Sequence, residues 1–119
     1  MFIYRKCSCE PERHHRDDVA EFNDVARSMK LLSTPSRIAL LSVLYKAPHC
    51  VSALQIHTGL SQTLISHHLK DLMAEGFVEN ARDGTFIRYR LTSHGRKLIG
   101  FVRDVKDGGK NNKRNTIKQ

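Results

Sequence analysis

The sequence predicts a mainly α-helical domain of about five helices that carries one small β-hairpin. Over most of residues 18–76, apolar residues recur every three or four positions, which is the spacing of amphipathic helices. From Phe77 the period changes to alternation around Asp83-Gly84, which is typical of a hairpin. The 119 residues are the size of one domain. A chain this short gains stability by burying a helix face in a dimer.

The first helix is predicted to begin at Asp18, because Glu21 three residues later completes a variant of the capping box. Its apolar stripe is expected to comprise Val19, Phe22, Val25 or Ala26, Met29 and Leu32. Thr34 and Pro35 then start a second helix, since threonine can cap a helix and proline fits the first helical position. The expected buried stripe of this helix is Ile38, Leu41 and Leu44.

The middle of the chain predicts two helices joined by a glycine-containing turn. Ser52 to Thr58 is long enough for a short helix, with Leu54 as its buried anchor. Ser61 is expected to cap the next helix, from about Gln62 to Glu75, which ends at Gly76. This order is typical of a helix-turn-helix unit.

The remainder of the chain predicts the hairpin and a last helix. In the hairpin, Val78, Ile87, Tyr89 and Leu91 are expected to cover the core while Arg82, Arg88 and Arg90 stay in water. Thr92 or Ser93 caps a helix to about Val105, with Leu98, Phe101, Val102 and Val105 on one face. We therefore predict a Cys- and His-containing arm at residues 1–16, one domain at 17–106 and a basic flexible tail at 107–119.

The composition favours a polyanionic partner. The formal net charge is +8, from 20 basic and 12 acidic residues. Such an excess attracts nucleic acid first and an anionic membrane surface second. No stretch approaches the length of a membrane span and the N-terminus lacks a secretory signal pattern, so we expect a cytoplasmic protein. The sequence contains no glycine-rich phosphate loop, paired carboxylates or nucleophile motif, so we do not expect an enzyme.

The helix at 62–75 has two unlike faces. On a helical wheel Ile65, Leu69 and Leu72 lie together, at positions that pack on the domain. The opposite side collects hydrogen-bonding side chains: Gln62, Thr63, Ser66, His67 and Lys70. Such a face suits base edges and phosphates in the major groove of DNA, with Lys70 as a phosphate contact. His68 lies at the border of the buried face, where a hydrogen bond against the preceding helix is at least as good an interpretation as DNA contact.

The chain from Leu31 to Leu91 resembles the ArsR family of winged-helix repressors. The resemblance lies in LLSTPSRIALLSVL, VSALQIHTGLSQTLISHHLKDLMAEGFV and RDGTFIRYRLT, in that order. It implies a winged helix-turn-helix fold, a bacterial or archaeal origin and a homodimer formed through the N- and C-terminal helices. It also implies binding to a palindromic operator in double-stranded DNA. Carried over to this chain, the recognition-helix positions are Gln62, Thr63, Ser66 and His67, and the wing positions are Arg82 and Arg88.

Many members of that family leave DNA when a metal or metalloid binds. Where thiolate-type sensors carry Cys-Val-Cys, this chain has Cys50-Val51-Ser52, so one ligand is missing. Another group of relatives binds metal on the last helix, but here only His94 lies near its start, so we do not expect that site.

The cysteines themselves suggest a sensor. An odd count, Cys7, Cys9 and Cys50, argues against a disulfide framework. Three thiolates suit a soft ion such as arsenite, antimonite or cadmium. The side chains of Glu10, His14, His15 and His49 are candidates to complete a zinc site instead.

Other interpretations stay open at this level. The same residues are compatible with a metal-independent regulator, with a redox-responsive one that uses disulfide exchange at Cys7 and Cys9, and with a regulator that has no cysteine sensing. A non-specific architectural DNA-binding protein and a metal carrier are further alternatives. An architectural DNA-binding protein would show a steep salt dependence without sequence preference. A metal carrier would bind metal without any change in DNA affinity.

Overall fold

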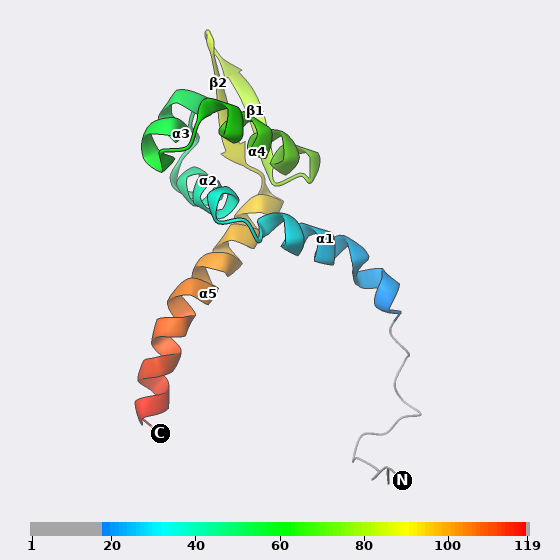
Figure 1. Cartoon of the computed structure of the whole chain (residues 1–119), viewed down its shortest axis with the longest axis vertical. Helices are drawn as coiled ribbons and strands as arrows, with labels where there is room; N and C mark the ends of the chain where they lie inside the picture. The colour runs from blue at the N-terminus through cyan, green and yellow to red at the C-terminus, as the bar shows by residue number, and fades with distance from the viewer. Residues whose placement is uncertain (1–17, 119) are drawn as a thin grey trace.

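The computed structural model describes residues 18–118, and the side chains of residues 18–108. The elements in chain order are the 3-10 turn η2 (Val19–Phe22), α1 (Asn23–Leu32), α2 (Pro35–Lys46), α3 (Val51–Thr58), α4 (Gln62–Ala74), β1 (Val78–Asp83), β2 (Phe86–Leu91) and α5 (Ser93–Lys118). Figure 1 shows α2, α3 and α4 grouped at the base of the hairpin, while α1 and α5 extend away from that group. The predicted fold class, mainly α-helical with one small hairpin, is confirmed.

Side-chain caps begin two of the helical elements, η2 and α4, whereas Thr34 at the N-cap of α2 makes no side-chain cap hydrogen bond. The Asp18 carboxylate accepts from the Ala20 backbone N–H at 3.1 Å, but it opens the 3-10 turn and the α-helix begins only at Asn23. The Ser61 hydroxyl accepts from the Leu64 N–H at 3.2 Å, as a helix N-cap does. Gly59 follows α3 with a φ of +73°, a left-handed conformation that glycine adopts without steric cost.

A single hydrophobic core joins the helices to the base of the hairpin. Its buried members are Leu32, Leu40, Leu41, Leu44, Leu54, Ile65, Leu69, Leu72, Phe77, Val78, Leu91 and Ile99. One prediction for α2 was wrong in part, because Leu40 is fully buried whereas Ile38 is only half-buried. The reason is that α2 packs against α1, α3, α5 and β2, so its buried surface is wider than one amphipathic stripe.

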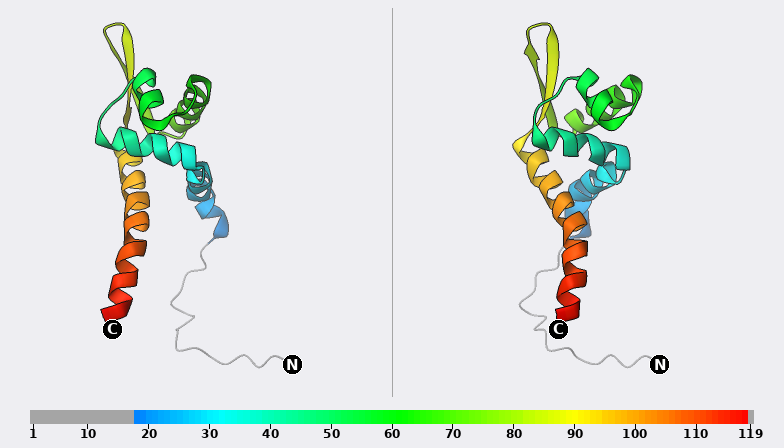
Figure 2. Two further views of the ribbon diagram at one scale, coloured as in Figure 1. Left: turned by 60° about the vertical axis from the view of Figure 1, so that its left-hand side comes forward. Right: turned by 90° about the vertical axis from the view of Figure 1, so that its left-hand side faces the viewer.

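The hairpin is antiparallel with a two-residue loop, Gly84-Thr85, because Asp83 pairs with Phe86. Val78 pairs with Leu91 at its base, where both are buried. The prediction that Ile87 covers the core was wrong, since its side chain is 42% exposed. Figure 2 shows why: the hairpin projects beyond the helices, so residues near its tip have no layer to pack on.

α5 differs most from its prediction. It was expected to end at about Val105 and to be followed by a flexible tail, but the helix continues to Lys118. Gly108 has no positive φ, so it does not act as a C-terminal stop. Once a helix is nucleated, each further residue adds a hydrogen bond at little cost, and glycine costs only about 1 kcal/mol relative to alanine.

An apolar surface on α1 and α5 is left uncovered. The exposed apolar side chains are Phe22 at the end of η2, Val25 and Met29 on α1, and Phe101 and Val105 on α5. These are the residues that the sequence placed on buried stripes, and within one copy of the chain nothing in the described residues covers them. No helix in the described part of the chain combines the length and hydrophobicity that a bilayer span requires.

Candidate nucleic-acid interface

α4 presents a polar face to solvent. Gln62, Thr63, Ser66, His67 and Lys70 are all exposed, whereas Ile65, Leu69 and Leu72 on the other side are fully buried. The helical period of the sequence therefore assigns these residues to their faces correctly. The His67 ring is the most constrained of the exposed set, because its Nε2 lies 3.7 Å from the Asp71 carboxylate one turn later.

α4 is tied to α2 by a set of polar contacts that the sequence did not reveal. Arg37 on α2 donates from Nε to His68 Nδ1 at 3.2 Å and from Nη2 to Asp71 Oδ2 at 3.1 Å. Its Nη1 donates to the Leu31 carbonyl at 3.0 Å, near the end of α1. One guanidinium thus holds three helices in register, and such forked donation is a property of arginine rather than lysine.

His68 is a buried part of this arrangement and not a surface contact. Because Arg37 donates to Nδ1, that nitrogen is an acceptor, and Nε2 carries the proton that His68 donates to Ser36 Oγ at 2.8 Å. Burial lowers the pKa of His68 below its ordinary 6.5, and the positive charge of Arg37 lowers it further. A hydrogen bond from His68 to another helix was expected against the preceding helix α3, but its partners Ser36 and Arg37 lie on α2.

The hairpin carries arginines on both of its faces. The register puts Arg82 on the face that includes Val78 and Tyr89, and puts Arg88 on the opposite face. Arg88 Nε lies 3.0 Å from Asp83 Oδ2, so an acidic neighbour partly neutralises it. Arg90 is paired with Glu79 at 2.9 Å in the same way. The sequence predicted three exposed arginines but missed that two of them are paired across the strands.

The connector between α2 and α3 joins the hairpin as a short third segment. His49 and Tyr89 exchange two backbone hydrogen bonds, at 3.0 and 2.8 Å, in an isolated antiparallel bridge. This contact fixes the start of α3 against the base of the hairpin. Backbone hydrogen bonds therefore connect the helix-turn-helix unit directly to the hairpin.

Cys50 occupies the N-cap of α3 and is half-buried. The backbone N–H of Ala53 lowers the pKa of its thiol below the ordinary value of 9.0, and contacts with Ser52 contribute further. His49 lies beside it in sequence, with its ring 5.0 Å from that of His57 and edge-on to it.

The other predicted metal ligands, Cys7, Cys9, Glu10, His14 and His15, lie outside the described residues. Residues 18–118 contain no group of three or more potential ligands close enough to hold an ion. His94, the remaining candidate on the last helix, stacks on the Phe77 ring with centroids 5.1 Å apart.

Comparison with known proteins identifies the family. Residues 34–80 match the family described as "Bacterial regulatory protein, arsR family". The nodulation protein NolR of Rhizobium meliloti is 32% identical over 96 residues, which cover 80% of this chain and 75% of NolR. The chain belongs to the ArsR family. With its winged helix-turn-helix fold it is a DNA-binding regulatory protein and not an enzyme.

Two further proteins are similar to this chain. The solution structure of the homodimeric winged helix-turn-helix domain of Mb0332 from Mycobacterium bovis is 32% identical, with a TM-score of 0.66. The match covers 74% of this chain and 82% of that one. The arsenical resistance operon repressor of Staphylococcus xylosus is 31% identical over 70 residues, which are 59% of this chain and 67% of that repressor.

Proposed function

We propose that this protein is a dimeric repressor that reads a palindromic operator in double-stranded DNA with α4 of each subunit. The observation that carries the proposal is the outward polar face of α4, made by Gln62, Thr63, Ser66 and His67, on a helix whose other face is fully buried. Side chains near the N-terminus of a recognition helix contact base edges in the major groove. Lys70 lies farther along the helix and is assigned to a phosphate.

The hairpin is assigned to the DNA backbone. With Arg82 and Arg88 on opposite faces, it presents a cation to either wall of a groove. Each phosphate that such a side chain neutralises adds roughly one unit to the salt dependence of binding. The pairing of Arg88 with Asp83 makes Arg82 the stronger contact of the two, because in the described residues it has no acidic partner within ion-pair distance.

The dimer is assigned to the uncovered apolar surface of α1 and α5. One copy of the chain offers an apolar surface that a second copy can bury, made by Phe22, Val25, Met29, Phe101 and Val105. An exposed apolar patch of this kind marks an interaction site. The homodimeric Mb0332 domain supports a twofold pair of winged helices, which a palindromic operator matches.

The effector is assigned to a soft metal or metalloid ion held by the thiolates of Cys7, Cys9 and Cys50. The lowered pKa of the Cys50 thiol supports this role, because the thiolate is the metal ligand. The similarity to an arsenical resistance operon repressor favours arsenite or antimonite among such ions. Binding would release DNA by favouring a dimer form in which the two α4 helices no longer match successive grooves.

The DNA assignment is tested by the double variant Ser66→Ala/His67→Ala. An operator is first selected from random duplexes, and fluorescence anisotropy then gives the affinity for operator and for random DNA at fixed salt. The variant is expected to lose most of its operator preference, because each lost base contact costs about 1–3 kcal/mol.

A matched control removes the same residue types from α3. Ser52→Ala/His57→Ala changes two exposed side chains that lie off the proposed reading face, and it should keep the operator preference. If the α4 variant prefers its operator as strongly as the wild type does, direct readout by these residues is wrong. If the wild type has a steep salt dependence and no preferred sequence, the architectural alternative holds instead.

The effector assignment is tested by titrating arsenite, antimonite, cadmium, zinc and an oxidant into the protein–operator complex. Wild type is compared with Cys7→Ser, Cys9→Ser and Cys50→Ser. Release by one of the ions that each substitution abolishes supports the thiolate site. Release by the oxidant alone supports the redox alternative. Metal binding without release supports a carrier, and no response from any addition leaves a regulator without cysteine sensing.

A further inference from the structure

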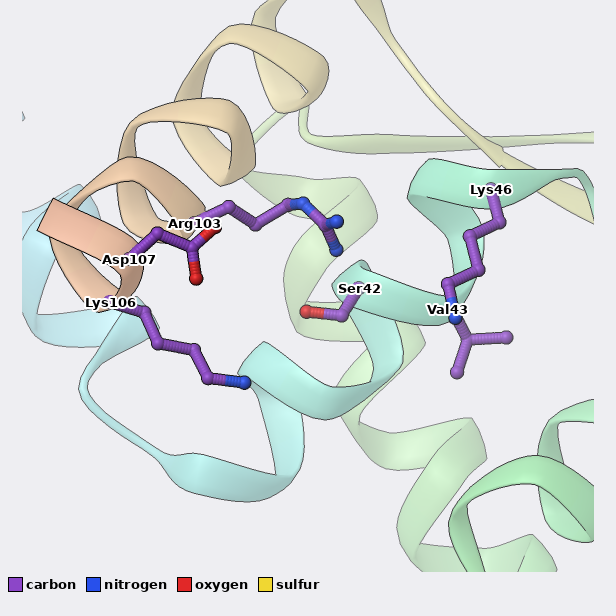
Figure 3. A pocket seen from close by; sticks show the side chains of 6 residues that line it. All are labelled: Ser42, Val43, Lys46, Arg103, Lys106 and Asp107. Atoms are coloured by element: carbon purple, nitrogen blue, oxygen red, sulfur yellow. The ribbon is translucent and has the colours of Figure 1, made fainter. Parts of the chain in front are cut away.

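A basic pocket lies between α2 and α5, and the residues that line it are not among those assigned to DNA or to metal. It has a volume of about 250 Å³ and is shown in Figure 3. Its lining residues are Ser42, Val43 and Lys46 of α2 with Arg103, Lys106 and Asp107 of α5. In Figure 3, Arg103 and Lys106 extend from α5 toward α2, and Ser42 lies between their ends.

The pocket is on the opposite side of α5 from the uncovered apolar surface. Arg103 follows Phe101 by two positions, which is about 200° around a helix that turns about 100° per residue. Lys106 follows Val105 directly and lies about 100° from it, on the same side as Arg103. A second copy that covers Phe101 and Val105 therefore leaves the pocket open to solvent.

The guanidinium of Arg103 is held in place before any ligand binds. It lies 4.9 Å from the centre of the Tyr45 ring, and Arg96 lies 5.1 Å from the same ring. Arg96 also donates to the Tyr45 carbonyl at 3.3 Å. Stacking on an aromatic ring reduces the conformational freedom that an arginine loses when it binds an anion. Tyr45 thus positions cationic groups at one side of the pocket.

The charge of the pocket is not compensated within the described residues. Lys46, Arg103 and Lys106 bring three cationic groups to it, against the one carboxylate of Asp107. Among the side chains of residues 18–108, none forms an ion pair within 4.0 Å with any of the three cations. Like charges around one pocket repel one another, and a bound anion relieves that repulsion.

We propose that this pocket binds the phosphate group of a small molecule. Arg103 supplies a forked donor that matches phosphate oxygens, Lys46 and Lys106 supply point charges, and the Ser42 hydroxyl is an additional donor. Three cationic groups match the two negative charges of a phosphate dianion better than they match the single charge of a carboxylate ligand. At about 250 Å³ the pocket is smaller than the sites of drug-sized ligands, so the ligand is small.

A small molecule is favoured over a DNA phosphate as the source of this group. Figures 1 and 2 show α5 running away from α4 and the hairpin, which are the elements assigned to DNA. The pocket also joins α2, which Arg37 connects to α4, to α5, which is assigned to the dimer surface. A ligand that bridges the two helices is therefore placed to influence how the subunits are arranged.

The test uses the full chain and inorganic phosphate as the probe. Phosphate is titrated at constant ionic strength, with sodium chloride as the balancing salt, and amide shifts are followed in two-dimensional NMR spectra. We expect saturable shifts centred on Ser42, Tyr45 and Arg103. Arg103→Gln and Lys106→Gln are each expected to weaken phosphate binding about tenfold, because a hydrogen bond to a charged group is lost.

The matched control is Lys97→Gln, which removes one charge from the same helix but outside this pocket. It should change phosphate affinity less than about twofold, since screened charges act weakly at a distance. Lys106 packs on no aromatic ring in the described residues, so its variant remains informative even if Arg103→Gln disturbs Tyr45.

Several outcomes would overturn the proposal. Shifts spread over the whole basic surface, or an equal loss in Lys97→Gln, would mean that phosphate binds without a site. Acetate binding as tightly as phosphate would remove the preference for a dianion. A third outcome combines two results. Free phosphate shows no specific binding, and Lys106→Gln weakens operator binding and lowers the salt dependence of that binding by about one unit. In that case the pocket binds a phosphate of the DNA. Phosphate binding is measured without DNA, so its failure leaves the repressor assignment untouched.

Discussion

Arg37 donates from Nε to Nδ1 of His68 across 3.2 Å and thereby fixes α4 against α2. The two residues are 31 positions apart in the chain. The same guanidinium reaches Asp71 on α4 and the carbonyl of Leu31 at the end of α1. A helix that reads DNA must be held in one orientation, and this contact ties it both to the core and to a helix of the proposed dimer surface.

Arg37→Lys is expected to lower the free energy of unfolding by about 1–3 kcal/mol, because the single nitrogen of an ammonium cannot reach all three acceptors that the guanidinium reaches, two on α4 and one on α1. Urea denaturation followed by circular dichroism measures the change. The control is Arg27→Lys, whose parent side chain is 61% exposed and forms ion pairs with Asp24 on the same helix and with Glu75 at the end of α4. It should cost less than about 1 kcal/mol. Equal effects of the two variants would show that Arg37 does not hold the helices together.

Stability is expected to fall as the pH drops below 6.5, the ordinary pKa of histidine, because the folded state lowers the pKa of His68. Between the lowered pKa and 6.5 the unfolded chain binds more protons than the folded one, so acid favours unfolding there. Above 6.5 the contribution of His68 is fully present. Denaturation curves at a series of pH values measure the slope of the unfolding free energy.

His68→Gln is expected to flatten that slope, whereas His57→Gln, at an exposed position on α3, should keep it. A slope that survives His68→Gln unchanged would assign the pH dependence to another group. Protonation also turns the Nδ1 acceptor of His68 into a donor that faces the Arg37 guanidinium, so the contact described above is lost in acid.

Asp83→Asn is expected to strengthen duplex binding, because it removes the carboxylate that lies 3.0 Å from Arg88 Nε. The freed arginine can then neutralise a phosphate, and the salt dependence of binding should become steeper by about one unit. Fluorescence anisotropy over a range of salt concentrations gives both quantities. Glu79→Gln frees Arg90 near the base of the hairpin and should have a smaller effect. Weaker binding by Asp83→Asn would place the hairpin away from the DNA.

Gly95→Ala is expected to destabilise the fold severely, because an added Cβ would overlap the backbone carbonyl of Phe77. The backbone on both sides is held by the core, so the overlap cannot be relieved by a side-chain rotation, and we expect a loss of about 3 kcal/mol or more. Gly100→Ala on the same helix meets nothing within 4 Å. It should stabilise the protein by about 0.5–1 kcal/mol through helix propensity. Thermal denaturation of the pair measures the contrast.

Much of the fold follows from local pattern in the chain. Helical spacing separated the exposed Ser66 and His67 from the buried Ile65, because a helix turns by a constant angle per residue. The cap at Ser61 and the stop at Gly76 were predicted for the same reason, since both depend on backbone groups within a few residues.

Other features depend on residues that are distant in the chain. Ile87 lies in a pattern typical of a half-buried strand, yet it is exposed because the helices cover only the base of the hairpin. The network around Arg37 and the pocket around Arg103 each unite helices far apart in sequence, and no local spacing signals them. Backbone geometry acts over about one turn, so the spacing of apolar residues is enough to place a side chain on one face of a helix. Only the packing of the helices decides which face meets another element and which charged groups form ion pairs.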